Sequence, residues 1–113
     1  MPAGIRFPCL AQWLDWQQAL HPQLVDLGLE RAARVLARTG WRRPGCPVII
    51  VGGTNGKGSC VALLASMIRA GGYRAGSFTS PHLVDYRERI RVNGDQVSEA
   101  SLIAAFERTA DAL

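Results

Sequence analysis

The stretch Val48-Ile-Ile-Val-Gly-Gly-Thr-Asn-Gly-Lys-Gly-Ser-Cys60 decides the expected fold of this 113-residue chain. Its β-branched run is typical of a buried parallel strand, and the glycine-rich segment after it is typical of a tight loop. The residues after Ser59 have helical apolar spacing. Strand, loop and helix in this order form a cradle in which backbone N–H groups and a helix N-terminus face one anion. The sequence therefore predicts a phosphate-binding loop.

Lys57 is the single lysine of a chain that carries twelve arginines. Its ammonium group is a compact point charge on a flexible stem, which suits a phosphate cradle better than a planar guanidinium. The loop departs from the pattern G-x-x-x-x-G-K-[ST], because Val51 and Gly58 replace the first glycine and the hydroxyl residue. The hydroxyl comes one residue later, at Ser59. A plain glycine-rich turn is the alternative, but the order of the elements favours a nucleotide site.

Apolar spacing and turn signals outline the rest of the fold. Helices are expected from Leu10 to about His21, from near Leu29 to Gly40, after Ser59, and from Ser98 onward. A second strand is expected from Tyr73 to Thr79, and Asn93-Gly94 is typical of a hairpin turn. Strand, helix and strand in succession predict a right-handed βαβ unit. The expected fold class is α/β, with a partial P-loop-containing parallel sheet flanked by helices.

Polar residues follow the second expected strand. Ser80 stands at its carboxyl end, where ligands bind to parallel sheets, so it is expected beside the phosphate loop. Arg87, Arg89 and Arg91 stand at alternate positions, which predicts three guanidinium groups on one face of an extended segment. That face is expected to be solvated or to order a loop, and not to clamp a substrate.

Composition narrows the classes of function. A net charge of +4 and a pI near 9.5 favour anionic partners, which include nucleotides, acidic metabolites and nucleic acids. Three cysteines without a C-x-x-C pair or nearby histidines predict reduced thiols in the cytoplasm and no metal site built on them. No stretch reaches membrane-spanning length, so no membrane partner is expected.

Three segments in order, Asp26-Leu-Gly-Leu-Glu-Arg31, Gly53-Thr-Asn-Gly-Lys-Gly-Ser59 and Thr79-Ser-Pro-His-Leu-Val-Asp-Tyr-Arg-Glu-Arg-Ile-Arg91, resemble the dihydrofolate synthase/folylpolyglutamate synthase family. The resemblance covers about residues 13–113 and concerns the N-terminal part of the family. That family belongs with the Mur ligases, so the resemblance implies a Mur-ligase-like central domain. Mur ligases usually have Thr or Ser directly after the lysine, and Gly58 followed by Ser59 resembles the folate branch.

The resemblance implies an ATP-dependent carboxylate–amine ligase that uses ATP and Mg²⁺. In such an enzyme ATP phosphorylates the carboxylate of a pteroate or folate, and the amine of L-glutamate then attacks the acyl phosphate. The products are an amide, ADP and phosphate. Whether the enzyme makes dihydrofolate, lengthens polyglutamate tails or does both stays open.

The family's functional residues carry over by position. The ATP phosphates would be held by Thr54, Asn55, Gly56, Lys57, Gly58 and Ser59, with Lys57 as the catalytic residue, and Ser80 would bind Mg²⁺. Val25, Asp26 and Leu27 match the segment that contacts the pterin. Two alternatives stay open: Asp26 is equally suited to cap a helix, and Ser80 before Pro81 is also an ordinary turn residue.

The last expected helix reaches Leu113 without a stop signal. We therefore expect residues 1–113 to be the N-terminal part of an ATP-binding ligase domain, with the rest of that domain and a C-terminal domain absent. The glutamate and histidine that complete the metal shell in the family are not among these residues. The chain alone is expected to be inactive, and the complete protein is expected to be a monomer.

Two rival functions follow from the same features. A Mur-type peptidoglycan ligase shares the phosphate loop, and pteroate binding distinguishes the two. A non-catalytic nucleotide- or nucleic-acid-binding module fits the arginines and the pI. Against nucleic acid, the basic residues are dispersed and no aromatic stacking platform accompanies them.

Overall fold

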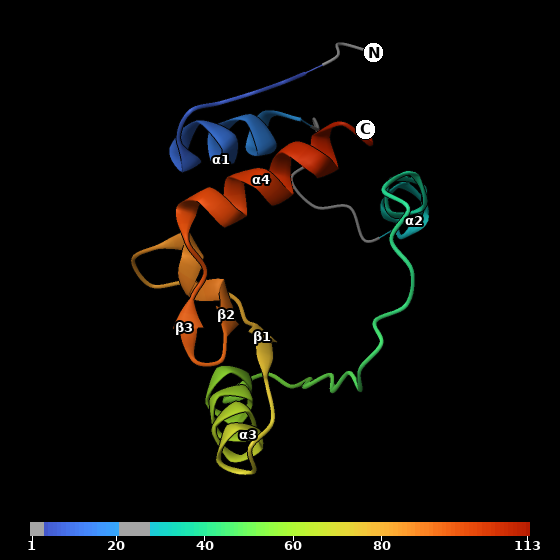
Figure 1. Cartoon of the computed structure of the whole chain (residues 1–113). Coiled ribbons are helices and arrows are strands. Elements are labelled where there is room, and N and C mark those ends of the chain that lie inside the picture. The colour runs from blue at the N-terminus through green and yellow to red at the C-terminus, as the bar shows by residue number, and fades with distance from the viewer. Residues whose placement is uncertain (1–3, 21–27) are drawn as a thin grey trace. The chain divides into compact units, whose positions relative to one another are not determined.

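The computed structural model describes residues 4–20 and 28–113, which divide into two compact units (Figure 1). The first unit comprises Met1–Gly45 and Glu99–Leu113, and the second comprises Cys46–Ser98. Within these described ranges, the helices are all too short or too polar to cross a membrane. The prediction of Val25, Asp26 and Leu27 as pterin contacts lies outside the described residues.

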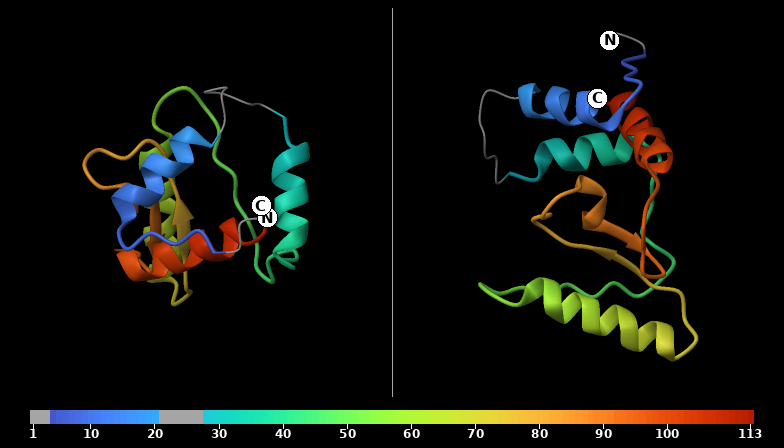
Figure 2. Two further views of the ribbon diagram at one scale, coloured as in Figure 1. Left: turned by 90° about the horizontal axis from the view of Figure 1, so that it is seen from above. Right: turned by 90° about the vertical axis from the view of Figure 1, so that its left-hand side faces the viewer.

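The described residues of the first unit form three helices: α1 (Leu10–Ala19), α2 (Glu30–Arg38) and α4 (Glu99–Ala110). Helix α1 packs against α4 (Figure 2). These three helices confirm the helices predicted for the same segments. The buried centre is Trp13, whose side chain is 0 % exposed and whose ring meets Phe7 edge-on at 5.2 Å and Phe106 at 5.9 Å. The Trp13 Nε1–H donates to the Phe7 carbonyl at 3.2 Å, so this buried indole leaves no polar atom unpaired.

Polar contacts fix the start of α1 on α4. The Glu99 Oε1 atom accepts a hydrogen bond from the Leu10 N–H at 2.9 Å. The first N–H groups of a helix have no intrahelical acceptor, so Glu99, itself the first residue of α4, caps α1 from another element. Near the other end of α4, Arg6 donates two bonds of 3.0 Å to the Asp111 carboxylate. The start of α1 and the segment before it are thereby attached near opposite ends of α4.

The second unit holds helix α3 (Lys57–Ala70) and a three-stranded sheet in the order β1-β2-β3. The strands are β1 (Gly76–Phe78), β2 (Ile90–Val92) and β3 (Asp95–Gln96), and both pairs are antiparallel. The Asn93-Gly94 turn is confirmed, with φ of 52° and 88° in the left-handed region that a two-residue hairpin turn favours. Asn93 Oδ1 also accepts from the Ala75 N–H at 2.9 Å, which ties the turn to the start of β1.

The antiparallel sheet corrects the predicted parallel pairing. The run from Val48 to Val51 is not assigned to a strand, and Ile50 is 89 % exposed. A strand exists only when its N–H and C=O groups pair with a neighbour, and no segment in the described part of the chain pairs with residues 48–51. The α/β class itself, with helices and a small sheet, is confirmed. β1 confirms the second expected strand in a shorter form.

The predicted row of three arginines on one face is also wrong. Residues Tyr86–Arg89 form a 3₁₀ turn, η1, and only β2 continues as a strand, so the alternation of side chains is broken. Each guanidinium has its own partner. Arg87 pairs with Asp85 at 2.7 Å, Arg89 donates to His82 Nδ1 at 2.9 Å, and Arg91 donates to the Gly94 carbonyl at 3.0 Å.

A capping box orders the loop between Ser80 and η1. The Asp85 carboxylate accepts from the Arg87 N–H, and the Glu88 carboxylate accepts from the Asp85 N–H. Hydrogen bonds from the Arg87 side chain and backbone lower the pKa of Asp85 from 3.8 to about 2. Bonds from backbone N–H groups, that of Asp85 first, hold the pKa of Glu88 below its usual range. Both carboxylates are therefore ionised acceptors at neutral pH.

We expect this loop to keep its structure in mild acid. Both carboxylates have lower pKa values when folded, so the stability that they contribute is present above the unfolded pKa and is lost as the pH falls through the folded pKa. An NMR titration of the Asp85 carboxyl carbon should give a midpoint at about pH 2, and the Arg87 amide signal should shift over the same pH range. A midpoint at the ordinary value of 3.8 would contradict the pairing with Arg87.

Candidate functional site

The N-terminus of α3 follows the predicted phosphate loop. Gly56 caps the helix with φ of 78°, a left-handed conformation that glycine adopts without steric cost. The first helical hydrogen bond runs from the Cys60 N–H to the Gly56 carbonyl at 3.0 Å. The N–H groups of residues 57–59 therefore belong to the first turn, where no intrahelical acceptor exists. They are the donors that an anion at this helix end would meet.

Space around the loop fits such an anion. Residues 52–60 are all exposed. A Cβ atom added at Gly52, Gly56 or Gly58 would meet nothing within 4 Å, so a ligand can approach the backbone there directly. Thr54 and Asn55 are exposed within the same loop. Open N–H donors without side chains in front of them suit a phosphate group.

Lys57 is the first residue of α3, and its ammonium reaches back over the loop. The Nζ atom donates to the Gly53 carbonyl at 2.6 Å. A charge-assisted bond to a phosphate oxygen is stronger than a bond to a neutral carbonyl. The same flexible stem can therefore exchange this acceptor for a phosphate that enters the loop.

Ser80 lies beside the phosphate loop, as predicted from its place after the second expected strand. A cavity of about 110 Å³ is lined by Lys57, Gly58, Thr79 and Ser80, together with Val51, Val61 and Phe78. The Ser80–Pro81 peptide bond is cis. The structure thus brings the predicted lysine and the predicted metal ligand to one small cavity in the second unit.

Ser80 provides one hydroxyl oxygen, and oxygen is the ligand atom that Mg²⁺ prefers. One oxygen does not complete the coordination shell of the metal. Among residues 4–20 and 28–113, no group of three or more His, Cys, Asp or Glu side chains could hold a metal ion. The nearby carboxylates of Asp85 and Glu88 accept hydrogen bonds within their own loop. The residues present fit one position in a magnesium shell.

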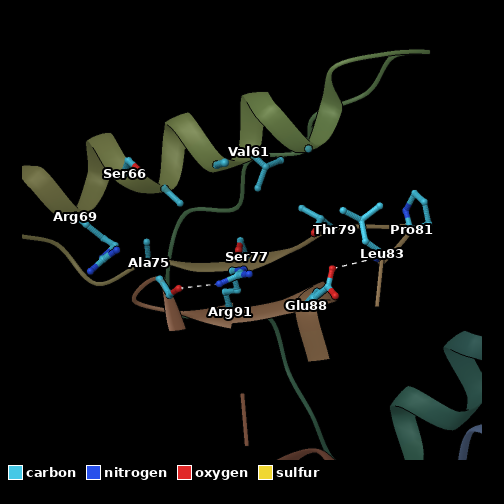
Figure 3. A pocket seen from close by; sticks show the side chains of 14 residues that line it. Val61, Ser66, Arg69, Ala75, Ser77, Thr79, Pro81, Leu83, Glu88 and Arg91 are labelled. Atoms are coloured by element: carbon cyan, nitrogen blue, oxygen red, sulfur yellow. Dashed lines mark hydrogen bonds between the residues drawn. The ribbon is translucent and has the colours of Figure 1, made fainter. Parts of the chain in front are cut away.

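A second cavity of about 460 Å³ lies between α3 and the sheet and was not predicted (Figure 3). Val61, Ser66 and Arg69 of α3 line one wall, and Ser77, Thr79, Glu88 and Arg91 lie on the other side. The sequence held one signal for this wall: Ala75, Ser77 and Thr79 are small residues at alternate positions, as on one face of a strand. Glu88 gave no comparable signal, because its role depends on how the loop folds.

Comparison of the sequence with known proteins identifies relatives of this chain. No protein-family model matches the chain. The dihydrofolate synthase/folylpolyglutamate synthase of Escherichia coli (strain K12) is 46 % identical over 97 residues, which cover 86 % of this chain and 23 % of the relative. The chain therefore spans about a quarter of the length of this relative.

Solved structures agree with the sequence match. E. coli FolC in complex with DHPP and ADP superposes with a TM-score of 0.88 at 44 % identity, over 92 % of this chain and 25 % of that one. A bifunctional folylpolyglutamate synthase/dihydrofolate synthase with Mn, AMPPNP and L-glutamate bound gives a TM-score of 0.83 at 38 % identity, over 92 % and 25 % of the two chains. By sequence and by structure, the chain belongs to the N-terminal portion of the dihydrofolate synthase/folylpolyglutamate synthase family.

Proposed function

We propose that this chain is the nucleotide-binding part of an ATP-dependent ligase that joins L-glutamate to dihydropteroate, folate or both. The observation that carries the proposal is the meeting of Lys57, the open α3 N-terminus and Ser80 at one small cavity. Relatives solved with ADP, AMPPNP, Mn and L-glutamate support it. Residues 1–113 would then form the N-terminal part of the ATP-binding domain of a cytoplasmic enzyme.

The geometry suggests a role for each residue. The loop from Thr54 to Ser59 would hold the ATP phosphates through its N–H groups, and Lys57 would neutralise charge on the transferred phosphoryl group. The Ser80 hydroxyl oxygen would contribute to holding Mg²⁺. When bound, Mg²⁺ supplies further charge neutralisation at the phosphates. This division of labour fits phosphoryl transfer, in which the protein mainly positions groups and stabilises charge.

In the proposed reaction a substrate carboxylate oxygen attacks the γ-phosphorus of ATP, and the bond to ADP breaks. The amine nitrogen of L-glutamate then attacks the acyl carbon. The amine loses a proton, the bond to phosphate breaks, and an amide remains. The DHPP in the E. coli FolC complex supports a pteroate-type acceptor, and we propose that Val25, Asp26 and Leu27 contact its pterin ring.

A nucleic-acid-binding role is less well supported. The three arginines of the segment that follows Ser80, Arg87, Arg89 and Arg91, each donate hydrogen bonds within the loop and hairpin. A guanidinium that already has protein acceptors contributes less to phosphate-backbone binding than a free one. A Mur-type peptidoglycan ligase remains a rival that a pteroate-binding measurement distinguishes.

Substitution of Lys57 tests the nucleotide site. We expect the chain to bind ADP in calorimetry and Lys57→Ala to weaken that binding at least roughly tenfold, because a charge-assisted phosphate contact is lost. Lys57→Arg should restore little, since a planar fork does not fit a cradle shaped for an ammonium. Arg108→Ala on α4 is the matched control for loss of one cation. Equal ADP affinity in wild type and Lys57→Ala would refute the phosphate role of Lys57.

Asp26→Ser separates pterin binding from helix capping. Serine caps a helix about as well as aspartate, so a capping role predicts no change in activity. A carboxylate that accepts two pterin hydrogen bonds is not replaced by one hydroxyl, because ring donors are left unpaired. In the complete enzyme we expect normal folding, normal ATP binding and at least roughly tenfold weaker dihydropteroate binding. Unchanged dihydropteroate affinity would assign Asp26 to the cap.

Residues 1–113 alone should bind nucleotide without turning over. The reason is that Ser80 is the one predicted metal ligand in the described ranges, where no acidic or histidine cluster completes a shell. The assay is ADP release from ATP in the presence of dihydropteroate and L-glutamate. Release that requires both substrates would show that this stretch carries the whole reaction.

A further inference from the structure

One carboxylate holds most of the loop that follows Ser80. Glu88 Oε2 accepts from the Leu83 N–H at 3.0 Å, and Glu88 Oε1 accepts from the Val84 and Asp85 N–H groups at 2.9 and 2.7 Å. Three consecutive N–H groups thus converge on one side chain. Figure 3 shows Glu88 at the end of the larger cavity, next to Leu83 and Pro81.

Burial does not hold residues 83 and 84 in place. The side chains of Leu83 and Val84 are 92 % and 91 % exposed, so the hydrophobic effect contributes almost nothing to their position. The His82 and Tyr86 rings on either side of these two residues contact each other at 5.6 Å, but exposed residues without apolar contacts of their own open easily unless hydrogen bonds order them. Here the bonds to Glu88 provide that order.

The base of the loop is closed as well. The Thr79 N–H donates to the Arg89 carbonyl at 2.8 Å, and Arg89 Nε donates to His82 Nδ1 at 2.9 Å. Ser80 lies between these two attachments and only three residues before the first N–H group that Glu88 binds. Residues 79–89 therefore form one ordered loop. The position of Ser80 in this loop depends on the hydrogen bonds on either side of it.

We propose that Glu88 is a positioning residue, which fixes residues 83–85 so that the Ser80 hydroxyl stays beside Lys57 and can take part in binding a magnesium–nucleotide complex. This inference rests on the proposed function. Glutamate suits the role because an ionised carboxylate is an acceptor at both oxygens. Glutamine has almost the same shape, but its NH₂ group would face N–H donors that need an acceptor.

The test compares AMPPNP binding to the 113-residue chain with and without Mg²⁺, in wild type, Ser80→Ala and Glu88→Gln. Glu107→Gln on α4 is the matched control for the same chemical change. We expect Mg²⁺ to strengthen wild-type binding and Ser80→Ala to lose that gain. Glu88→Gln should reduce the gain about tenfold, the equivalent of roughly one strong hydrogen bond, without changing metal-free binding. Hydrogen exchange of the residue 83–85 amides should become faster in Glu88→Gln only.

Each outcome decides between the proposals. If Mg²⁺ strengthens binding, Ser80→Ala abolishes the gain and Glu88→Gln retains it, the inference is wrong and the proposed function stands. Unchanged amide exchange in Glu88→Gln would also overturn the inference. If Glu88→Gln weakens metal-free and metal-dependent binding equally, Glu88 only supports folding and does not position Ser80. If Mg²⁺ has no effect on the wild type, the proposed role of Ser80 fails, and the inference about Glu88 fails with it.

Discussion

The structure depends on which groups accept hydrogen bonds from the backbone N–H groups that have no backbone acceptor. In the first unit the leading N–H of α1 is satisfied by Glu99 from α4. In the second unit three loop N–H groups are satisfied by Glu88. The first turn of α3 is the contrasting case, because its N–H groups stand in open space beside glycines. Two sets of donors thus stabilise the fold, and the third is open to a ligand.

Local signals in the sequence predicted the elements that local physics controls. Helix α3 begins directly after Gly56, at the end of the glycine-rich loop. The Asn93-Gly94 turn forms because both residues adopt the left-handed conformation readily. The proximity of Lys57 and Ser80 was predicted from their places after two expected strands, and it is observed although residues 48–51 form no strand.

Features that depend on distant partners were not predictable. The run at Val48 has strong strand propensity, but propensity does not say which segment supplies the hydrogen bonds. The alternation of Arg87, Arg89 and Arg91 suggested a strand, whereas Asp85 and Glu88 stabilise a 3₁₀ turn through two of these positions. A capping box of two carboxylates outweighs a period-two pattern when no partner strand pairs with the segment.

The position after Lys57 connects the loop chemistry with the second strand. In the standard phosphate loop a hydroxyl at this position binds the metal, but here the residue is Gly58. Steric crowding does not explain the glycine, because a Cβ there would meet nothing within 4 Å. The same small cavity receives Ser80 from the end of β1. Under the proposed function, the hydroxyl group that binds magnesium therefore comes from Ser80 on a neighbouring loop. How accurately this hydroxyl is placed depends on the Glu88 carboxylate, which orders that loop.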